Sequence, residues 1–160
     1  MRKSIAVACG LTLLAASAAH AQVNPRGEAR ATVAGKAVAV EYGRPSLKGR
    51  DMLGQAQVGQ SWRMGADGAT TLETEADLVF GTAVVPKGDY VLTARKLAEG
   101  KWALVVSRAD KTVVAEVPLA ASTAPESVET FTIDLKGADK GGDFEMKWGT
   151  TVLKAPFTVR

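Results

Sequence analysis

The 160-residue chain has a single cysteine and a single histidine, and both lie within its first 21 residues. Beyond that point the sequence therefore has no Ser-His-Asp triad and no Cys-His pair. It also lacks the usual zinc ligands, and it has no thiol for a disulfide or for redox chemistry. We therefore predict no metal site and no cofactor, and a fold that depends on its hydrophobic core alone.

The first 21 residues have the three parts of a secretory signal peptide. Arg2 and Lys3 are positive, residues 5–16 are largely apolar and uncharged, and residues 19–21 (Ala-His-Ala) have the small-x-small pattern of a cleavage site. The apolar run is shorter than the ~20 residues of a membrane span. We expect cleavage after Ala21, export to the periplasm or the extracellular space, and no membrane span. The alternative interpretation is a buried N-terminal helix.

Charge is nearly balanced in the remainder of the chain. Two of the 20 basic residues and none of the 17 acidic ones precede residue 22, so the predicted exported chain has a formal charge of +1 rather than +3. A nearly neutral chain has no overall electrostatic reason to bind nucleic acid. It is equally poor in the polybasic clusters that hold a protein on anionic lipid.

Short segments rich in valine, threonine and aromatic residues make up most of the chain, separated by glycine, proline and aspartate. They recur about every 8–12 residues with alternating apolar and polar side chains, which is typical of a β-sandwich or barrel. Alternation of this kind favours antiparallel sheets with one face in water. We predict an all-β, antiparallel β-sandwich of about nine or ten strands. It forms a single domain at residues 29–160, after a loose leader at residues 22–28.

The individual strands are expected at residues 29–33, 36–42, 61–64, 70–74, 78–85, 101–107, 113–117, 130–135, 144–148 and 152–159. Ala34 and Gly35 should turn the first two into a hairpin. The clearest hairpin is expected at residues 84–96 (VVPKGDYVLTARK), with its turn at Pro86 and Gly88. Trp102 and Trp148 lie on apolar strand faces and are predicted to be core residues.

Residues 43–59 form a glycine-rich stretch without a strand pattern, and a loop of this length is unusual in a compact domain. We expect it to fold back onto residues 62–70 at one end of the sheets, making a cationic patch beside an indole. Arginine side chains there suit carboxylate, sulfate or phosphate, and an indole suits a sugar ring. The predicted ligand-binding residues are Arg44, Ser46, Lys48, Arg50, Trp62, Arg63, Asp67 and Thr70.

Three alternatives to a binding module for an anionic or carbohydrate ligand stay open. The arginine side chains could only pin the long loop by donating to its carbonyl groups. A carboxylate-dependent hydrolase would use two of the candidate catalytic acids Glu41, Asp51 and Asp67, placed about 5 Å or about 6.5–9.5 Å apart. A structural envelope protein would instead recruit protein partners by strand addition at exposed sheet edges.

Several stretches of the sequence also resemble a known family. They are YGRPSLKGRDMLG, VGQSWRMGADGATTLETEADLVFG, VPKGDYVLTARK, KWALVVS and FEMKWGTTVLKAPFTV. Together they resemble the exported bacterial domain-of-unknown-function family 2911 over residues 29–159, most specifically at residues 42–50 and 62–70. Family members usually have Asn or Asp followed by Glu or a small residue where this chain has Asp67-Gly68. The resemblance implies an exported all-β domain and brings no established activity.

Overall fold

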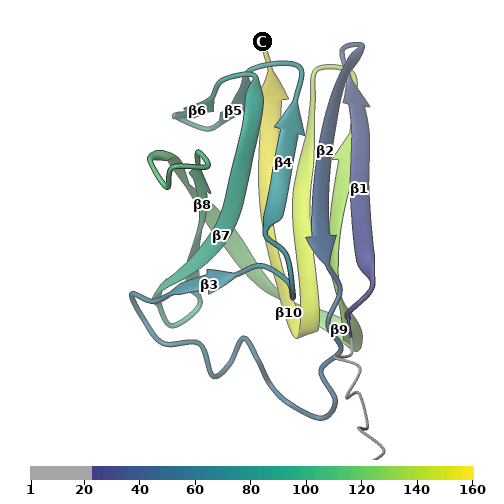
Figure 1. Ribbon diagram of the computed structural model, residues 1–160, viewed down its shortest axis with the longest axis vertical. Coiled ribbons are helices and arrows are strands. Elements are labelled where there is room, and N and C mark those ends of the chain that lie inside the picture. Colours follow the sequence, from purple (N-terminus) through teal and green to yellow (C-terminus); the bar gives the residue numbers. More distant parts are fainter. Residues whose placement is uncertain (1–22) are drawn as a thin grey trace, which may run out of the picture.

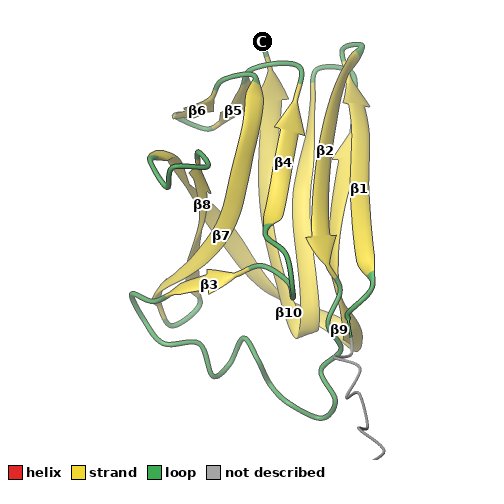
Figure 2. Ribbon diagram, viewed as in Figure 1, coloured by secondary structure: helices red, strands yellow, loops and turns green. Residues whose placement is uncertain are grey.

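The computed structural model describes residues 23–160, so the predicted signal peptide lies outside the described residues. This part of the chain forms ten strands and no helix (Figures 1 and 2), and it accordingly contains no helix that could cross a membrane. The strands are β1 (Arg26–Val33), β2 (Lys36–Gly43), β3 (Ser61–Arg63), β4 (Thr70–Thr74), β5 (Leu78–Phe80), β6 (Ala83–Val85), β7 (Gly88–Ala98), β8 (Lys101–Ser107), β9 (Val113–Gly137) and β10 (Gly141–Val159).

The ten strands form one open antiparallel sheet in the order β1-β2-β4-β7-β8-β9-β10-β5-β6, with β3 paired to β7. The sheet folds over at β9, whose first residues pair with β8 and whose remaining residues pair with β10. As a result β1, β2, β4 and β7 lie in front of β9 and β10 (Figure 1). The two layers touch where the Tyr42 hydroxyl donates to the Ile133 carbonyl at 3.1 Å. The all-β, antiparallel prediction is confirmed, and the two layers belong to one continuous sheet.

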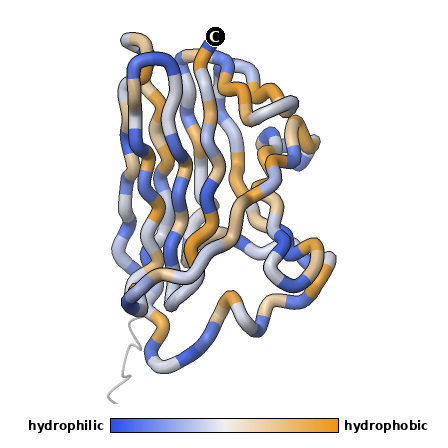
Figure 3. The backbone as a smooth tube through the Cα atoms, turned by 180° about the vertical axis from the view of Figure 1, so that it is seen from behind, coloured by the Kyte–Doolittle hydropathy of each residue, from blue (hydrophilic) through white to orange (hydrophobic). Residues whose placement is uncertain are grey.

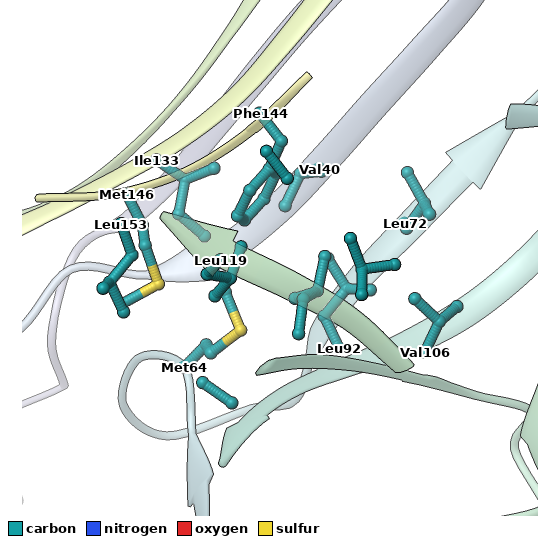
Figure 4. Close-up of a cluster of buried hydrophobic side chains, with 14 of the residues drawn as sticks. Val40, Met64, Leu72, Leu92, Val106, Leu119, Ile133, Phe144, Met146 and Leu153 are labelled. Carbon is teal, nitrogen blue, oxygen red and sulfur yellow. The ribbon is translucent and has the colours of Figure 1, made fainter. Parts of the chain in front are cut away.

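Alternating side chains build the core between the layers, and hydropathy alternates along many of the strands (Figure 3). In Figure 4, Leu72 and Leu92 of the front layer face the same interior as Ile133 and Met146 of the back layer. Each of these side chains is almost fully buried, and full burial of such a side chain stabilises a fold by about 1.5–3 kcal/mol. The core role expected of the two tryptophans is confirmed, since Trp102 is 5% and Trp148 4% exposed.

Two predicted breaks between strands are absent. Residues 113–117 and 130–135 belong to the single strand β9, and residues 144–148 and 152–159 belong to β10. The residues between these predicted strands stay extended and form no turn. Opposite Gly149 of β10, the longer strand β9 has more residues than its partner, and the pairing is irregular there. Pro125 lies in that irregular stretch, where its missing N–H removes no regular ladder bond.

The hairpin predicted at residues 84–96 is wrong, although the turn at Pro86 is real. Strand β6 pairs with β5, whereas β7 pairs with β3, β4 and β8. The turn therefore carries the chain from one layer to the other, and the Tyr90 hydroxyl closes it by donating to the Pro86 carbonyl at 2.7 Å. The strand expected at residues 78–85 is also divided, by a turn at Gly81 with φ of 60°.

The first hairpin is confirmed, but it begins earlier than predicted. β1 starts at Arg26 rather than at residue 29, so the leader ends three residues sooner. The Arg44 N–H donates to the Pro25 carbonyl at 2.7 Å, and both terminal nitrogens of Arg26 donate to the Ala69 carbonyl at 3.4 Å. These contacts extend the strand into residues whose sequence has no alternating apolar pattern.

Candidate functional site

The chain between β2 and β3 is held against the sheet at both of its ends. Near its start, the Leu47 N–H donates to the Glu129 carbonyl and the Phe131 N–H donates to the Pro45 carbonyl, both at 2.9 Å. Ser46 forms an isolated bridge with Thr130 between these two bonds. The first part of the loop therefore lies along β9 as a short additional stretch of strand.

The far end of the loop is attached to β7. The Gly59 N–H donates to the Lys96 carbonyl at 2.8 Å, and Val58 forms a bridge with the same residue. Between the two ends, the Asp51 carboxylate accepts from the Gly54 N–H at 2.9 Å and stabilises a local turn. The loop is thus an ordered part of the domain, which suits it for presenting side chains in fixed positions.

Two glycines allow the segments on either side of the loop to cross at close range. A side chain at Gly43, the last residue of β2, would collide with the backbone carbonyl of Ala66. Gly65 has φ of 120°, and a Cβ atom there would lie 2.7 Å from the Gly43 carbonyl oxygen. The folding back of residues 62–70 onto the glycine-rich stretch therefore depends on both positions having no side chain.

A pocket of about 430 Å³ lies where these segments meet. Five of the eight predicted ligand-binding residues line it, namely Ser46, Lys48, Arg50, Trp62 and Arg63. The sequence interpretation missed the remaining lining residues, which are Asn24, Pro45, Met52, Gly65, Ala66 and Trp148. Trp148 comes from the opposite layer, and no sequence pattern indicates that a core residue of β10 also forms a pocket wall.

The other three predicted residues have different surroundings. The Arg44 side chain lies over Gly27, and its Nε is buried without a hydrogen-bond partner among residues 23–160. The Asp67 carboxylate accepts from the Asn24 N–H at 2.7 Å. Thr70 is fully buried, and its hydroxyl donates to the Met64 carbonyl. These three residues shape the chain around the pocket and do not line it.

Packed aromatic rings form one wall of the pocket. The rings of Trp62 and Trp148 are stacked, with centroids 5.8 Å apart and an interplanar angle of 26°. Phe131 meets both of them edge-on, at 5.5 Å and 5.6 Å, and also contacts Tyr42. The Trp148 Nε1 donates to the Glu129 carbonyl at 3.3 Å, which fixes its ring. This wall is rigid, because its aromatic side chains hold one another.

Positive charge lines the rest of the pocket. Nη1 of Arg63 donates to the Asp67 carbonyl at 3.0 Å, and Nε of Arg50 donates to the Leu47 carbonyl at 3.2 Å. Each arginine is thus held by one bond, as the pinning alternative expects. Within residues 23–160 their remaining guanidinium nitrogens have no protein acceptor, and no ion pair includes Lys48, Arg50 or Arg63.

No acidic side chain lines this pocket. Glu41 is on the outer face of the front layer, 3.9 Å from the guanidinium of Arg26, while Asp51 and Asp67 accept the backbone bonds described above. The three candidate catalytic acids therefore do not meet in it. The described part of the chain also has no cluster of acidic, histidine or cysteine side chains that could hold a metal ion.

These features define an all-β domain with a cationic, indole-walled pocket at one end of its folded sheet. The chain belongs to the family described as "Protein of unknown function (DUF2911)", whose model matches residues 24–157. The resemblance seen in the sequence is thereby confirmed. Searches of curated proteins and of solved structures found no match to this chain.

Proposed function

We propose that this protein is an exported binding module for a small anionic ligand whose ring has an apolar face, such as a sugar acid or an aromatic carboxylate. One observation supports this proposal above all: the pocket presents Lys48, Arg50 and Arg63 with no acidic side chain among its lining residues. The stacked indoles beside these cations supply the apolar surface for the ring.

The chemistry of the lining residues matches such a ligand. A guanidinium group offers two parallel N–H donors to a carboxylate, and charged hydrogen bonds of this kind are roughly twice as strong as neutral ones. Because Arg50 and Arg63 are each already held by a backbone carbonyl, little side-chain freedom would be lost on binding. Trp62 is half-buried and lines the pocket, so its indole can contact a sugar or aromatic ring without selecting one ring type.

Export is part of this proposal and depends on the first 21 residues. Mass spectrometry of the protein recovered from outside the cytoplasm should show a chain that begins at Gln22. Recovery of the uncleaved 160-residue chain from the cytoplasm would contradict this part alone and would leave the proposed ligand site unaffected.

The binding proposal can be tested with Arg50→Gln and Arg63→Gln, which keep a polar side chain but remove the charge. Glucuronate, benzoate and inorganic phosphate serve as probes in isothermal titration calorimetry. Tryptophan fluorescence gives a second readout, because two of the three tryptophans line the pocket. We expect glucuronate or benzoate to bind, and each substitution to weaken binding by about tenfold or more, the equivalent of one charged hydrogen bond.

Arg108→Gln is the matched control, because Arg108 is exposed and does not line the pocket. This variant should bind each probe as the native protein does. The proposal fails if neither ring-bearing probe binds. It also fails if binding is unchanged in both pocket variants while their stability falls, because the arginines would then only pin the loop.

A further inference from the structure

Strand β1 ends the sheet on one side, and among the described residues it pairs only with β2 (Figure 1). We propose that the other edge of β1 pairs with β1 of a second copy of this chain. The pairing is antiparallel, with a two-fold axis at Ala29, so that Glu28 of each copy lies opposite Arg30 of the other. This inference is independent of the pocket proposed above.

The turn after β1 determines which backbone groups reach the outer edge. Ala34 and Gly35 have φ of 50° and 73°, and a two-residue turn with positive φ at both positions is of type I′. The residues that flank it, Val33 and Lys36, form the first hydrogen-bonded pair of the hairpin. Successive residues of a strand point their N–H and C=O groups to opposite sides. Because those of Val33 face β2, the N–H and C=O groups of the even-numbered residues from 26 to 32 point away from β2.

Only one register uses all four of these residues and also matches their charges. Centred on Ala29, it pairs Glu28 with Arg30 twice, and it pairs Arg26 with Thr32 at both ends. A register one step to either side pairs three residues and places Glu28 opposite Glu28, or Arg30 opposite Arg30. Like charges directly opposite each other destabilise an antiparallel pair. Because the Thr32 carbonyl already faces Gly137 of β9, the choice of this register rests on its complementary charges rather than on the number of backbone bonds.

The acidic face beside β1 provides a second argument. Within one chain Glu28 lies directly opposite Glu41, and Glu73 lies directly opposite Asp89. All four carboxylates line one groove of about 330 Å³, in which Arg30 is the single cation. Pairing of two β1 strands would place a second Arg30 on the free side of Glu28, where it offsets the repulsion from Glu41.

Residues 24 and 25, which precede β1, do not cover its outer edge. Pro25 is tied to Arg44, which follows β2, and Asn24 is tied to Asp67, so residues 24 and 25 turn toward the interior of the sheet. At the other end of the strand, Gly137 of β9 lies against the Thr32 carbonyl. The two pairs of Glu28 with Arg30, rather than the two pairs of Arg26 with Thr32, therefore supply most of the charge complementarity between the copies.

The test uses two single variants, Glu28→Arg and Arg30→Glu, an equimolar mixture of the two, and a chain that carries both substitutions. Sedimentation equilibrium should show a reversible dimer of the native protein. Each single variant puts like charges across the axis and should raise the dissociation constant by about tenfold or more. An equimolar mixture of the two variants should form heterodimers, because each Arg then faces a Glu. The chain carrying both substitutions should dimerise like the native protein.

The mixture separates pairing from folding, since both single variants also lose the ion pair between Arg30 and Glu28 within one chain, at 2.5 Å. Circular dichroism and thermal melting show whether each variant is folded. A native protein that stays monomeric up to about 1 mM, the weak end of specific association, overturns the proposal. Folded single variants that neither lose self-association nor form heterodimers overturn it as well.

Discussion

Thr70 shows how a polar residue in the right neighbourhood can have a purely structural role. Its position at the end of residues 62–70 predicts a ligand contact, but Thr70 is fully buried and donates to the Met64 carbonyl. The sequence did hold a signal for this, because Thr70, Leu72 and Thr74 alternate along β4 and all three are buried. Alternation around an apolar residue was a better guide to the orientation of Thr70 than its proximity to arginine.

We expect Thr70→Val to destabilise the fold by about 1–3 kcal/mol, because the buried Met64 carbonyl loses its donor. Thr70→Ser keeps the hydroxyl and should cost less, about 1 kcal/mol for the lost methyl group. Chemical denaturation measures both values. Since Thr70 does not line the pocket, neither variant should change probe affinity, and a selective loss of binding in Thr70→Val would contradict the structural role.

Glu145 is the most buried acidic side chain that takes part in an ion pair, with 11% of its side chain exposed. The ammonium of Lys147 lies 2.6 Å from its carboxylate, and that of Lys136 lies 3.5 Å away. The hydrogen bond from Lys147 is the main cause that lowers the pKa of Glu145, and the same bond raises the pKa of Lys147. The pair is therefore more stable when both groups are charged.

The signs of these shifts give a pH dependence. A lowered carboxyl pKa adds stability above the unfolded pKa of about 4.3, and this stability is lost as the pH falls through the folded value. Glu145→Gln should therefore cost roughly 1–3 kcal/mol at pH 7 and little at pH 2. Asp143→Asn is the control: it breaks the more exposed pair with Lys154 and should cost about 0–1 kcal/mol. Equal losses for Glu145→Gln at both pH values would contradict the electrostatic explanation.

At the scale of elements, the sequence predicted where the strands lie better than which strands pair with each other. Alternation located β2, β4 and β8 almost to the residue, although residues 102–106 of β8 are buried on both faces. It could not show that β9 belongs to both layers. A strand that changes partners keeps the same extended backbone, and only the pairing with β8 and then with β10 reveals the change.

The position of the pocket was predictable for a related reason. Glycines, a proline and cations gathered in two stretches indicated a loop that packs by close backbone approach, and β2 and β3 do bring the two stretches together. The sequence could not predict that Trp148 lines the pocket, because that residue reaches it only through the packing of β10 on the other layer. Contacts between layers depend on the fold of the whole sheet and leave no local pattern.

The crossing at the end of β2 leads to a prediction about this element. Gly43→Ala should destabilise the protein by about 1–3 kcal/mol, because the new methyl group meets the rigid Ala66 carbonyl. Any remaining folded protein should also bind the probes more weakly, since the segment that carries Arg63 must move. Gly81→Asn is the control, because Gly81 has open space around it and asparagine tolerates its φ of 60°. A Gly43→Ala variant with native stability would show that the two segments do not need this close approach.

At the scale of the whole molecule, the absence of histidine after residue 20 predicts a flat response to pH around neutrality. Ordinary carboxyl groups titrate near pH 4, and tyrosine and lysine near pH 10. Burial is the main cause that raises the pKa of Tyr90, whose hydroxyl donates to the Pro86 carbonyl. A raised tyrosine pKa adds stability below the unfolded value of about 10, and this stability is lost as the pH rises through the folded value.

We therefore expect the free energy of unfolding, measured by denaturant titration across a pH series, to be nearly constant between about pH 6 and pH 9 and to fall outside that range. This profile also bears on the hydrolase alternative. A general acid in a glycoside hydrolase is a carboxyl group whose pKa is raised toward 6 or 7. Such a group would make stability change with pH between about 6 and 7, inside the range that is expected to be flat. A flat profile in that range would contradict a carboxyl pKa raised toward about 6 or 7 in the folded protein, and would favour a pocket that binds its ligand without acid catalysis.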